Sequence, residues 1–403
     1  MQMTRSKTHC DSVARINPKI LKWAREALNL SIDEVIYQLK ISSVTSKVLL
    51  DWEQGEDFPR VHIAKKLAKL YGLPFIIFYL QDIPKKIRPL KDFRGVGALP
   101  FSRNFIFLMR DIQGKQELLK ELRLQEHRPA IPFVKSVKYS EQVAGLIKAL
   151  SKIILSQVKL KKQADKNIRS LTLLFESLGI SVSFSNSFNG HYLYAVSPKE
   201  VRGFAIADPI APFIFVNSKD SDTAQLFTLL HEFCHILLGQ TGIGDQSNRE
   251  DNSIETLCNR ATAEFLIPTD QFEKIWRTIR SKDLEEQVSI LTKHFPVSSL
   301  SILIKLFSTD KIPYTVFETA YTKHKEAFEQ ILQEKKERKR EKSTNGFAPS
   351  DILLFRKNGK NFTYAVLDGL QKGHIGFLDA CSALGITNRN KFDVYINKWS
   401  KHL

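Results

Sequence analysis

The apolar segment 222–239 constrains the fold most, because it contains two histidines and a glutamate among leucine, isoleucine and phenylalanine. His231 and His235 are four residues apart, so on a helix they lie about 40° apart around the axis and one turn apart along it. Two imidazoles in this arrangement can bind one metal ion at about 2.0–2.1 Å. Without such a partner, burying them beside Glu232 would be costly. The segment therefore predicts a buried helix that carries metal ligands.

Glu232 follows the first histidine on an adjacent face of this helix. There it can take a proton from a metal-activated water without being a ligand, which is the role of a general base. A catalytic zinc site needs three protein ligands. Glu255, near the start of a second helix expected over 252–266, is the preferred third ligand. Asp251 remains a rival, and Glu264 is interpreted as a surface charge.

Short β-rich segments precede the metal-ligand helix and should form a small, largely antiparallel sheet. They are separated by turn residues and follow three expected helices near 104–126, 138–158 and 164–178. The last segment is expected at the sheet edge, where Phe213 and Phe215 would help to hold an extended substrate by strand addition. The expected strands are Ile180–Phe184, Tyr192–Val196, Gly203–Ala207 and Phe213–Val216.

The first eighty residues predict a compact all-helical unit with a helix-turn-helix. Asn17 and Pro18 begin the first helix, and a capping box at Ser31 begins the second. A third helix ends before Gly55, and a fourth runs from Pro59 to Gly72. The candidate DNA-binding residues lie around the start of the third helix: Ser43, Thr45, Ser46 and Lys47.

The charge of the chain leaves the partner of this unit open. The formal net charge of +17 favours an acidic partner such as DNA. The third helix itself offers one lysine beside four acids, Asp51, Glu53, Glu56 and Asp57, and acids repel phosphate. Two interpretations follow with equal weight, a DNA-binding domain or a domain that recognises a repressor protein.

Several of these segments resemble a known family. The metal-ligand segment Phe227–Gly239 and the following segment Glu255–Pro268 resemble the ImmA/IrrE-type metallopeptidases. The upstream segments 202–207 and 211–217 resemble the strands before the active-site helix of that family, and 17–25 with 52–55 resemble the Cro/repressor-like domain often fused to it. The resemblance covers about residues 13–310 and is looser beyond them.

The resemblance implies a zincin-like fold in which His231, His235 and Glu255 bind zinc and Glu232 is the base. It also implies limited proteolysis of a protein substrate, often a DNA-binding repressor. Two histidines and a carboxylate also accept manganese, so Mn²⁺ remains an alternative to Zn²⁺.

The expected fold is α+β and mostly helical, with four parts along the chain. Residues 1–82 form the helix-turn-helix domain and 83–137 a basic linker with a connecting helix. Residues 138–310 form the zincin-like domain, and 311–403 a helical region of unknown role in which Asp351–Leu403 looks like a separate element.

The cysteines and the apolar runs indicate a cytoplasmic protein without membrane contact. Cys10, Cys234, Cys258 and Cys381 lie far apart and form no disulfide pattern, and no stretch is long and apolar enough to span a bilayer. Cys234 and Cys258 are interpreted as core residues, with a redox-sensitive Cys234 as the alternative.

The sequence therefore predicts a regulatory metallo-endopeptidase that cleaves one or few proteins. The alternative is a DNA-binding regulator or antitoxin whose metal domain is structural or sensory, while a digestive peptidase fits poorly. A donor for the oxyanion is expected among four residues that the sequence does not rank: His191, Tyr192, Tyr194 and His294.

Overall fold

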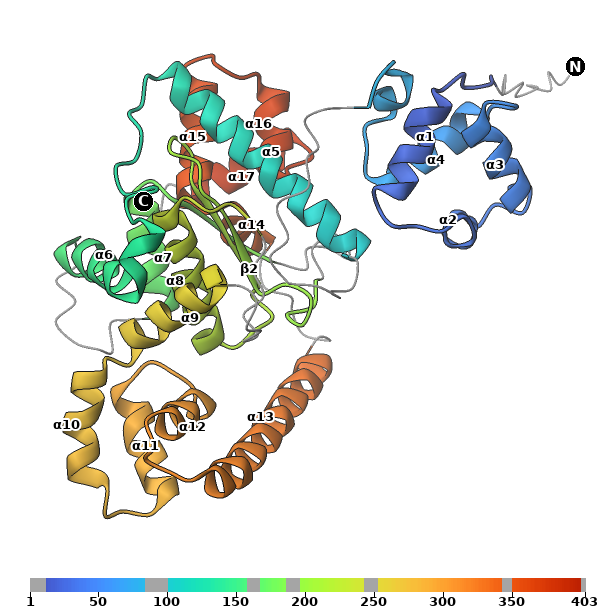
Figure 1. Ribbon diagram of the computed structural model, residues 1–403. Coiled ribbons are helices and arrows are strands. Elements are labelled where there is room, and N and C mark those ends of the chain that lie inside the picture. The colour runs from blue at the N-terminus through green and yellow to red at the C-terminus, as the bar shows by residue number, and fades with distance from the viewer. Residues whose placement is uncertain are drawn as a thin grey trace, which may run out of the picture. The chain divides into compact units, whose positions relative to one another are not determined.

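The computed structural model describes residues 12–83, 101–157, 167–185, 196–242, 253–342 and 350–399 (Figure 1). The chain divides into two compact units. Residues 12–83 and 101–110 belong to the first, and the described residues from Asp111 onward belong to the second. The described part is mostly helical with one small sheet, which confirms the expected α+β class.

The first unit contains the four expected helices and a short 3₁₀ segment. They are α1 (Pro18–Glu26), α2 (Ile32–Leu39), α3 (Ser46–Gln54), α4 (Val61–Tyr71) and η1 (Phe75–Tyr79). The side chain of Asn17 caps α1, and Ser31 with Glu34 forms the expected capping box on α2. Gly55 ends α3 with φ +82°, a conformation that only glycine adopts without strain.

A buried ion pair joins α1 to α3 in the first unit. Arg25 binds both carboxylate oxygens of Glu53, with Nε–Oε1 and Nη2–Oε2 distances of 2.7 and 2.8 Å. Glu53 is 7% exposed. The prediction that Glu53 is one of the acids near a DNA-binding surface was therefore wrong. Its carboxylate faces inward and is neutralised by Arg25.

The sheet of the second unit has the strand order β1–β3–β2. Its strands are β1 (Ser181–Phe184), β2 (Gly203–Ile206) and β3 (Phe213–Val216), and all their residues are buried. β3 pairs with β2 antiparallel and with β1 parallel. The sheet is therefore mixed, whereas a largely antiparallel one was expected. Of the expected strand Tyr192–Val196, all but Val196 lies outside the described residues.

The position of β3 also overturns the predicted substrate strand. β3 lies between β1 and β2, so its backbone is paired on both sides and cannot accept a further strand. Phe213 and Phe215 are both fully buried. The physical reason is that β2 and β3 are joined by a short connection and pair as neighbours, while β1 is separated from β2 by enough chain to pair on the far side of β3.

One face of this sheet packs on the helices that carry the metal-ligand candidates. Alternate strand residues such as Val182, Ala205 and Ile214 share a hydrophobic core with α7 (Ile168–Ser177) and α8 (Asp222–Leu238). α6 (Gln142–Gln157) and α9 (Ser253–Leu266) complete this layer. The helices expected near 104–126, 138–158 and 164–178 correspond to α5 (Arg103–Gln125), α6 and α7.

The C-terminal helices are part of the second unit. They are α14 (Ser350–Asn358), α15 (Lys360–Gln371), α16 (Phe377–Leu384) and α17 (Arg389–Trp399), and they share a core with Leu119 of α5. Ser183 of β1 donates a hydrogen bond to the carbonyl of Lys357 on α14. The expectation of a separate element at Asp351–Leu403 was thus wrong for its described residues, because these helices cover apolar surface that the strands would otherwise expose.

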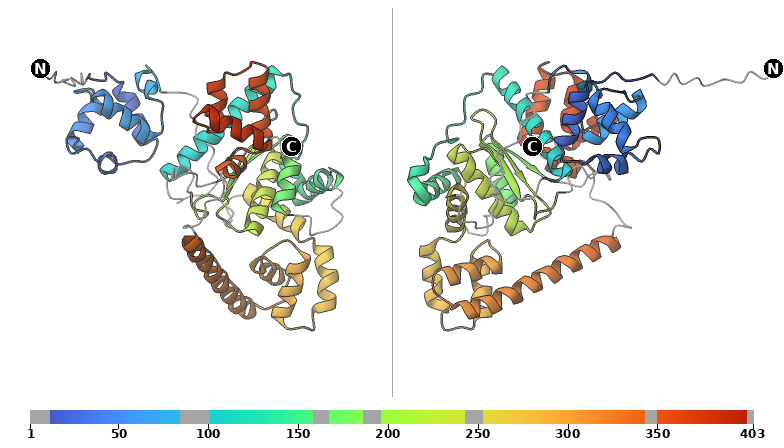
Figure 2. Two further views of the ribbon diagram at one scale, coloured as in Figure 1. Left: turned by 180° about the vertical axis from the view of Figure 1, so that it is seen from behind. Right: turned by 45° about the vertical axis from the view of Figure 1, so that its right-hand side comes forward.

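Four further helices follow α9 along the chain: α10 (Thr269–Ile279), α11 (Leu284–His294), α12 (Ser299–Ser308) and α13 (Tyr314–Lys342). Within the second unit, they lie at the opposite end from α15–α17 (Figures 1 and 2). Among the described helices, none alone is long and apolar enough to cross a membrane, although the pair α11 and α12, bent by 110°, meets that requirement together.

Candidate metal centre

The helix α8 positions two of the candidate ligands. The side chain of Ser221 caps its first turn by accepting a hydrogen bond from the amide of Ala224. Gly239 ends the helix in the left-handed conformation, at φ +69°. Between them the helix is enclosed by the sheet, α7 and α9, so His231 and His235 are 0% and 2% exposed.

Glu255 joins the two histidines from the first turn of α9. The Nε2 atoms of His231 and His235 are 3.0 Å apart. The Glu255 oxygens lie 3.0 Å from His231 Nε2 and 3.2 Å from His235 Nε2. Three donor atoms from two helices therefore converge on one point, and the carboxylate is 3% exposed.

The spacing of these donors suits a tetrahedral zinc site. With metal–ligand bonds of about 2.0–2.1 Å, tetrahedral geometry places ligand atoms about 3.3 Å apart. The observed separations of 3.0–3.2 Å are close to this value. Nδ1 of His231 and Oε1 of Glu255 make no hydrogen bond to any described residue, although both are buried. Two imidazoles and a carboxylate that are enclosed in this way fit a divalent cation.

Neither of the other two acids considered in the sequence analysis is seen in the donor cluster. Asp251 lies outside the described residues. Glu264 lies about two and a half turns after Glu255 along α9, where it accepts hydrogen bonds from Thr269 and pairs with Lys305 at 3.2 Å. Glu264 therefore links α9 to α10 and α12 rather than joining the donor cluster.

The charges of the cluster depend on its burial. Burial lowers the pKa of His231, which favours the neutral imidazole that a metal requires. Burial alone would raise the pKa of Glu255, but the two neighbouring imidazoles outweigh it and hold the pKa at about 2. The group is thus an ionised carboxylate beside two imidazoles.

Glu232 lies beside the cluster without joining it. It is 1% exposed, and its Oε2 atom makes no hydrogen bond to a described residue. Burial, followed by the nearby Glu255 and Cys234, raises its pKa well above the ordinary value of 4.5. A carboxyl group with a raised pKa and a free oxygen is suited to accepting and returning a proton.

Gly203 of β2 provides the space for Glu232, a relation that the sequence interpretation missed. A Cβ atom at Gly203 would lie 3.1 Å from Oε1 of Glu232, 2.8 Å from the carbonyl oxygen of Phe215 and 2.4 Å from Cγ2 of Thr228. β2 therefore passes so close to α8 that only glycine fits. The glycine at the start of a predicted strand was the available signal, since such glycines often mark a close approach.

Asn259 is a second residue that the sequence interpretation missed. It follows Glu255 by one turn of α9, is 9% exposed, and acts on His231 to raise the pKa of that imidazole. A buried amide beside a ligand histidine can fix the orientation of the ring. The spacing of four residues from Glu255 could have indicated it, because both side chains then lie on one face of the helix.

The comparison with known proteins places this cluster within a family domain. Residues 175–307 match the model of the IrrE N-terminal-like domain. It is a peptidase family of the M78 type, so the match supports a metallopeptidase domain of the ImmA/IrrE type and implies a metal, typically zinc. No curated protein matches the chain. The matched range includes all three strands, α8 and α9, and hence the whole donor cluster, while the N-terminal unit lies outside it.

Two cysteines lie in the core of the matched region. Cys234 and Cys258 are both fully buried between α8 and α9, and Sγ of Cys234 is 3.7 Å from Oγ1 of Thr262. Burial raises the pKa of Cys258 well above its ordinary value. Both features favour the interpretation as core residues, because a reactive thiol needs exposure and a low pKa.

The residues considered for oxyanion stabilisation are not brought into the cluster. His191, Tyr192 and Tyr194 lie outside the described residues. His294 is exposed at the end of α11, where its Nδ1 atom bonds the carbonyl of Ile290.

The predicted DNA-binding residues lie around the start of α3 in the first unit. Thr45 caps the helix with its hydroxyl, and the hydroxyl of Ser46 donates to Asp33 of α2 at 2.8 Å. Ser43 and Lys47 are exposed. Two of the four side chains thus have structural partners, and two face solvent.

Proposed function

We propose that the protein is a regulatory metallo-endopeptidase that cleaves a protein substrate, a DNA-binding repressor, at a site formed by α8, α9 and β2. The observation that carries the proposal is the convergence of three buried donor atoms beside a carboxylate that is not one of them. The match to the IrrE N-terminal-like domain over the same residues supports it.

In this proposal His231, His235 and Glu255 hold a divalent cation. Zinc suits the two nitrogens and one oxygen best, and manganese accepts the same set. The cation would supply Lewis acidity that activates water and polarises the scissile carbonyl.

Glu232 is the proton carrier of the reaction. Its free Oε2 accepts a proton from the attacking water and returns it to the leaving amine. The burial of all these groups strengthens their electrostatic interactions, because little water screens them.

The substrate would extend along β2, which is the strand beside α8 at the edge of the sheet formed by the described residues. The amide of Gly242 donates to the carbonyl of Ala205, so the outward groups of β2 are those of Ala205 and, two residues earlier, Gly203. No described residue bonds the outward N–H and C=O of Gly203. A substrate strand that pairs there would lie next to Glu232.

The presence of Glu232 favours hydrolysis over a structural or sensory metal domain. A scaffold requires ligands but no base, and burying an extra carboxyl group with an unpartnered oxygen costs stability. A cost of this kind is expected at a catalytic site.

The test compares metal content and cleavage in matched variants. Purified wild type is expected to contain about one equivalent of zinc, Glu255→Ala to contain none, and the rival variant Asp251→Ala to retain it. Glu232→Gln should retain the metal and lose activity. Candidate repressors from neighbouring genes are incubated with wild type and Glu232→Gln, and products are identified by mass spectrometry. Equal products from both proteins, or wild type without metal, would refute the peptidase proposal and favour the non-proteolytic regulator.

For the N-terminal unit we propose two roles to be separated by experiment, DNA binding and recognition of the repressor. The exposed Lys47 and Ser43 support contact with DNA, and the bonds of Thr45 and Ser46 within the unit reduce that surface. Mobility shift of promoter DNA with the full chain and with Lys47→Ala tests the first role. Co-purification of the repressor with the same two proteins tests the second.

A further inference from the structure

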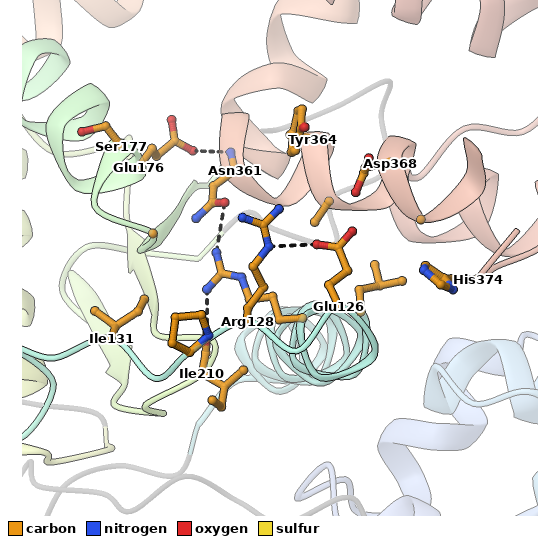
Figure 3. A pocket seen from close by; sticks show the side chains of 16 residues that line it. Glu126, Arg128, Ile131, Glu176, Ser177, Ile210, Asn361, Tyr364, Asp368 and His374 are labelled. Carbon is orange, nitrogen blue, oxygen red and sulfur yellow. Dashed lines mark hydrogen bonds and ion pairs between the residues drawn. The ribbon is translucent and has the colours of Figure 1, made fainter. Parts of the chain in front are cut away.

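A cavity of about 360 Å³ lies in the second unit, away from the metal-ligand candidates. It is formed where the end of α5 and the residues after it meet the end of α7 and the helix α15 (Figure 3). Its lining includes the basic residues Arg123 and Arg128, the acids Glu126 and Glu176, and Asn361. This volume is within the range of small-molecule sites.

Arg123 is a half-buried cation whose hydrogen bonds go to neutral groups. Its Nη1 donates to the carbonyl of Ile210 at 2.7 Å, and its Nη2 donates to Oδ1 of Asn361 at 3.0 Å. No carboxylate of a described residue is within ion-pair distance. Burial, together with repulsion from Arg128, lowers the pKa of Arg123 to about 10. The nearby carboxylates of Asp208 and Glu126 favour the charged form, so the guanidinium stays charged at neutral pH, but neither of them forms a direct ion pair with it.

The neighbouring acids are already committed to other partners. Glu126 accepts from Nε of Arg128 at 2.9 Å and also pairs with Lys372, as Figure 3 shows in part. Asp368 pairs with the same lysine at 2.6 Å. Glu176 accepts hydrogen bonds from the backbone amides of Lys360 and Asn361 at the start of α15. Each of these carboxylates makes its hydrogen bonds and ion pairs to groups other than Arg123.

The lining of the cavity offers hydrogen-bond donors that no described residue uses. A guanidinium has five N–H groups, of which Arg123 uses two in hydrogen bonds to described residues. Arg128 bonds Glu126 through Nε alone, and Nδ2 of Asn361 is buried without a described partner. The buried Nδ2 of Asn361 lacks the acceptor that a buried donor normally has, and the free N–H groups of Arg123 and Arg128 face the same cavity.

We propose that this cavity binds a small anionic metabolite through an oxyanion group, a carboxylate or a phosphate, held between Arg123 and Arg128. Planar guanidinium groups match both oxyanions, because each can donate two parallel hydrogen bonds. The anion would compensate the charge of Arg123 and accept from Nδ2 of Asn361. The proposal does not depend on the peptidase activity, since the cavity and the metal-ligand cluster share no residue.

The test measures binding of two probes, inorganic phosphate and succinate, to the full chain by calorimetry and by thermal shift. Chloride at matched ionic strength controls for screening of surface charge. At least one probe is expected to raise the melting temperature of wild type above the chloride control. Arg128→Ala should weaken its binding at least about tenfold. Arg128 is 55% exposed on its side chain, so this variant should fold even where Arg123→Lys does not.

Arg277→Ala is the matched control, because Arg277 is an exposed residue of α10 outside the cavity. It should bind like wild type. A preference for succinate would identify the oxyanion as a carboxylate, and a preference for phosphate would identify it as a phosphate. The proposal fails if neither probe exceeds the chloride control, or if Arg128→Ala and Arg277→Ala bind equally well.

Discussion

Gly203→Ala tests the close approach of β2 to the helix that carries Glu232. The new methyl group would lie 2.4 Å from Cγ2 of Thr228, 2.8 Å from the carbonyl oxygen of Phe215 and 3.1 Å from Oε1 of Glu232. Carbon atoms pack at about 3.5–4.0 Å, so β2 and α8 must separate by about 1 Å or distort. The neighbours are a buried backbone and two buried side chains, so little can move freely.

Two effects of different size follow from this displacement. Overpacking of a well-packed core costs about 1–3 kcal/mol, and the free energy of unfolding should fall by that amount. A displacement of about 1 Å at a catalytic group can reduce the rate about 100-fold. The metal ligands are not among the atoms that the methyl group meets, so zinc content should be unchanged.

The assay combines urea unfolding of the variants with their metal content and cleavage rate. Gly114→Ala is the control, because a Cβ at this helical position of α5 meets no atom within 4 Å. It should raise the free energy of unfolding by about 0.5–1 kcal/mol through helix propensity. Thr228→Ser removes the methyl group at 2.4 Å and should restore part of the stability of Gly203→Ala in the double variant. If Gly203→Ala is as stable and active as wild type, the steric argument for β2 is refuted.

Four further predictions follow from the described contacts. Glu255→Ala should abolish zinc binding with the fold intact, as measured by metal analysis and circular dichroism. Glu232→Gln should keep the metal and lower the cleavage rate about 100- to 10,000-fold, and an unchanged rate would exclude this residue as the base. Arg25→Ala should lower the free energy of unfolding by about 3–5 kcal/mol, because it leaves Glu53 buried and unpaired. Urea unfolding measures this loss, and a value below about 1 kcal/mol would contradict the prediction. Burial raises the pKa of Glu176 to about 7, so its folded form binds a proton that the unfolded chain releases above pH 4.5. Wild type should therefore lose up to about 3 kcal/mol of stability between pH 4.5 and 7 and level off above, and Glu176→Gln should lack this loss in urea titrations at each pH.

Two residues of the donor cluster, His231 and His235, could be named from the sequence because their relation is local. The spacing of His231 and His235 fixes their geometry on any helix. Glu255 could be chosen from its position at the start of the next helix, although the sequence could not exclude Asp251 by distance. The ends of the helices in the first unit could be predicted from capping residues and glycines, because a cap acts within one turn of its helix.

The relations that the sequence did not predict are non-local. The apolar sequence of Phe213–Val216 is compatible with an edge strand and with a central strand. Only the strands that pair with it determine its position in the sheet. Glu53 reads as a surface acid until Arg25, twenty-eight residues earlier, is placed beside it. One signal was present: strands that are apolar or small on both faces imply two covering layers. Here the second layer includes α14, from a part of the chain that looked separate.

The sequence interpretation expected β3 at the edge of the sheet, but among the described strands β2 lies there. This difference changes the chemistry that the site can perform. A substrate paired with β3 would have placed its backbone beside the paired interior of the sheet, where no base lies. In the proposed arrangement, pairing with β2 would place the substrate beside Gly203, whose missing side chain leaves space next to Glu232. The histidines and Glu255 come from two helices that pack on each other, but the position of the base relative to the substrate depends on a third element. The metal site could therefore form without activity if β2 were displaced, so metal binding and cleavage must be measured separately in every variant of this strand.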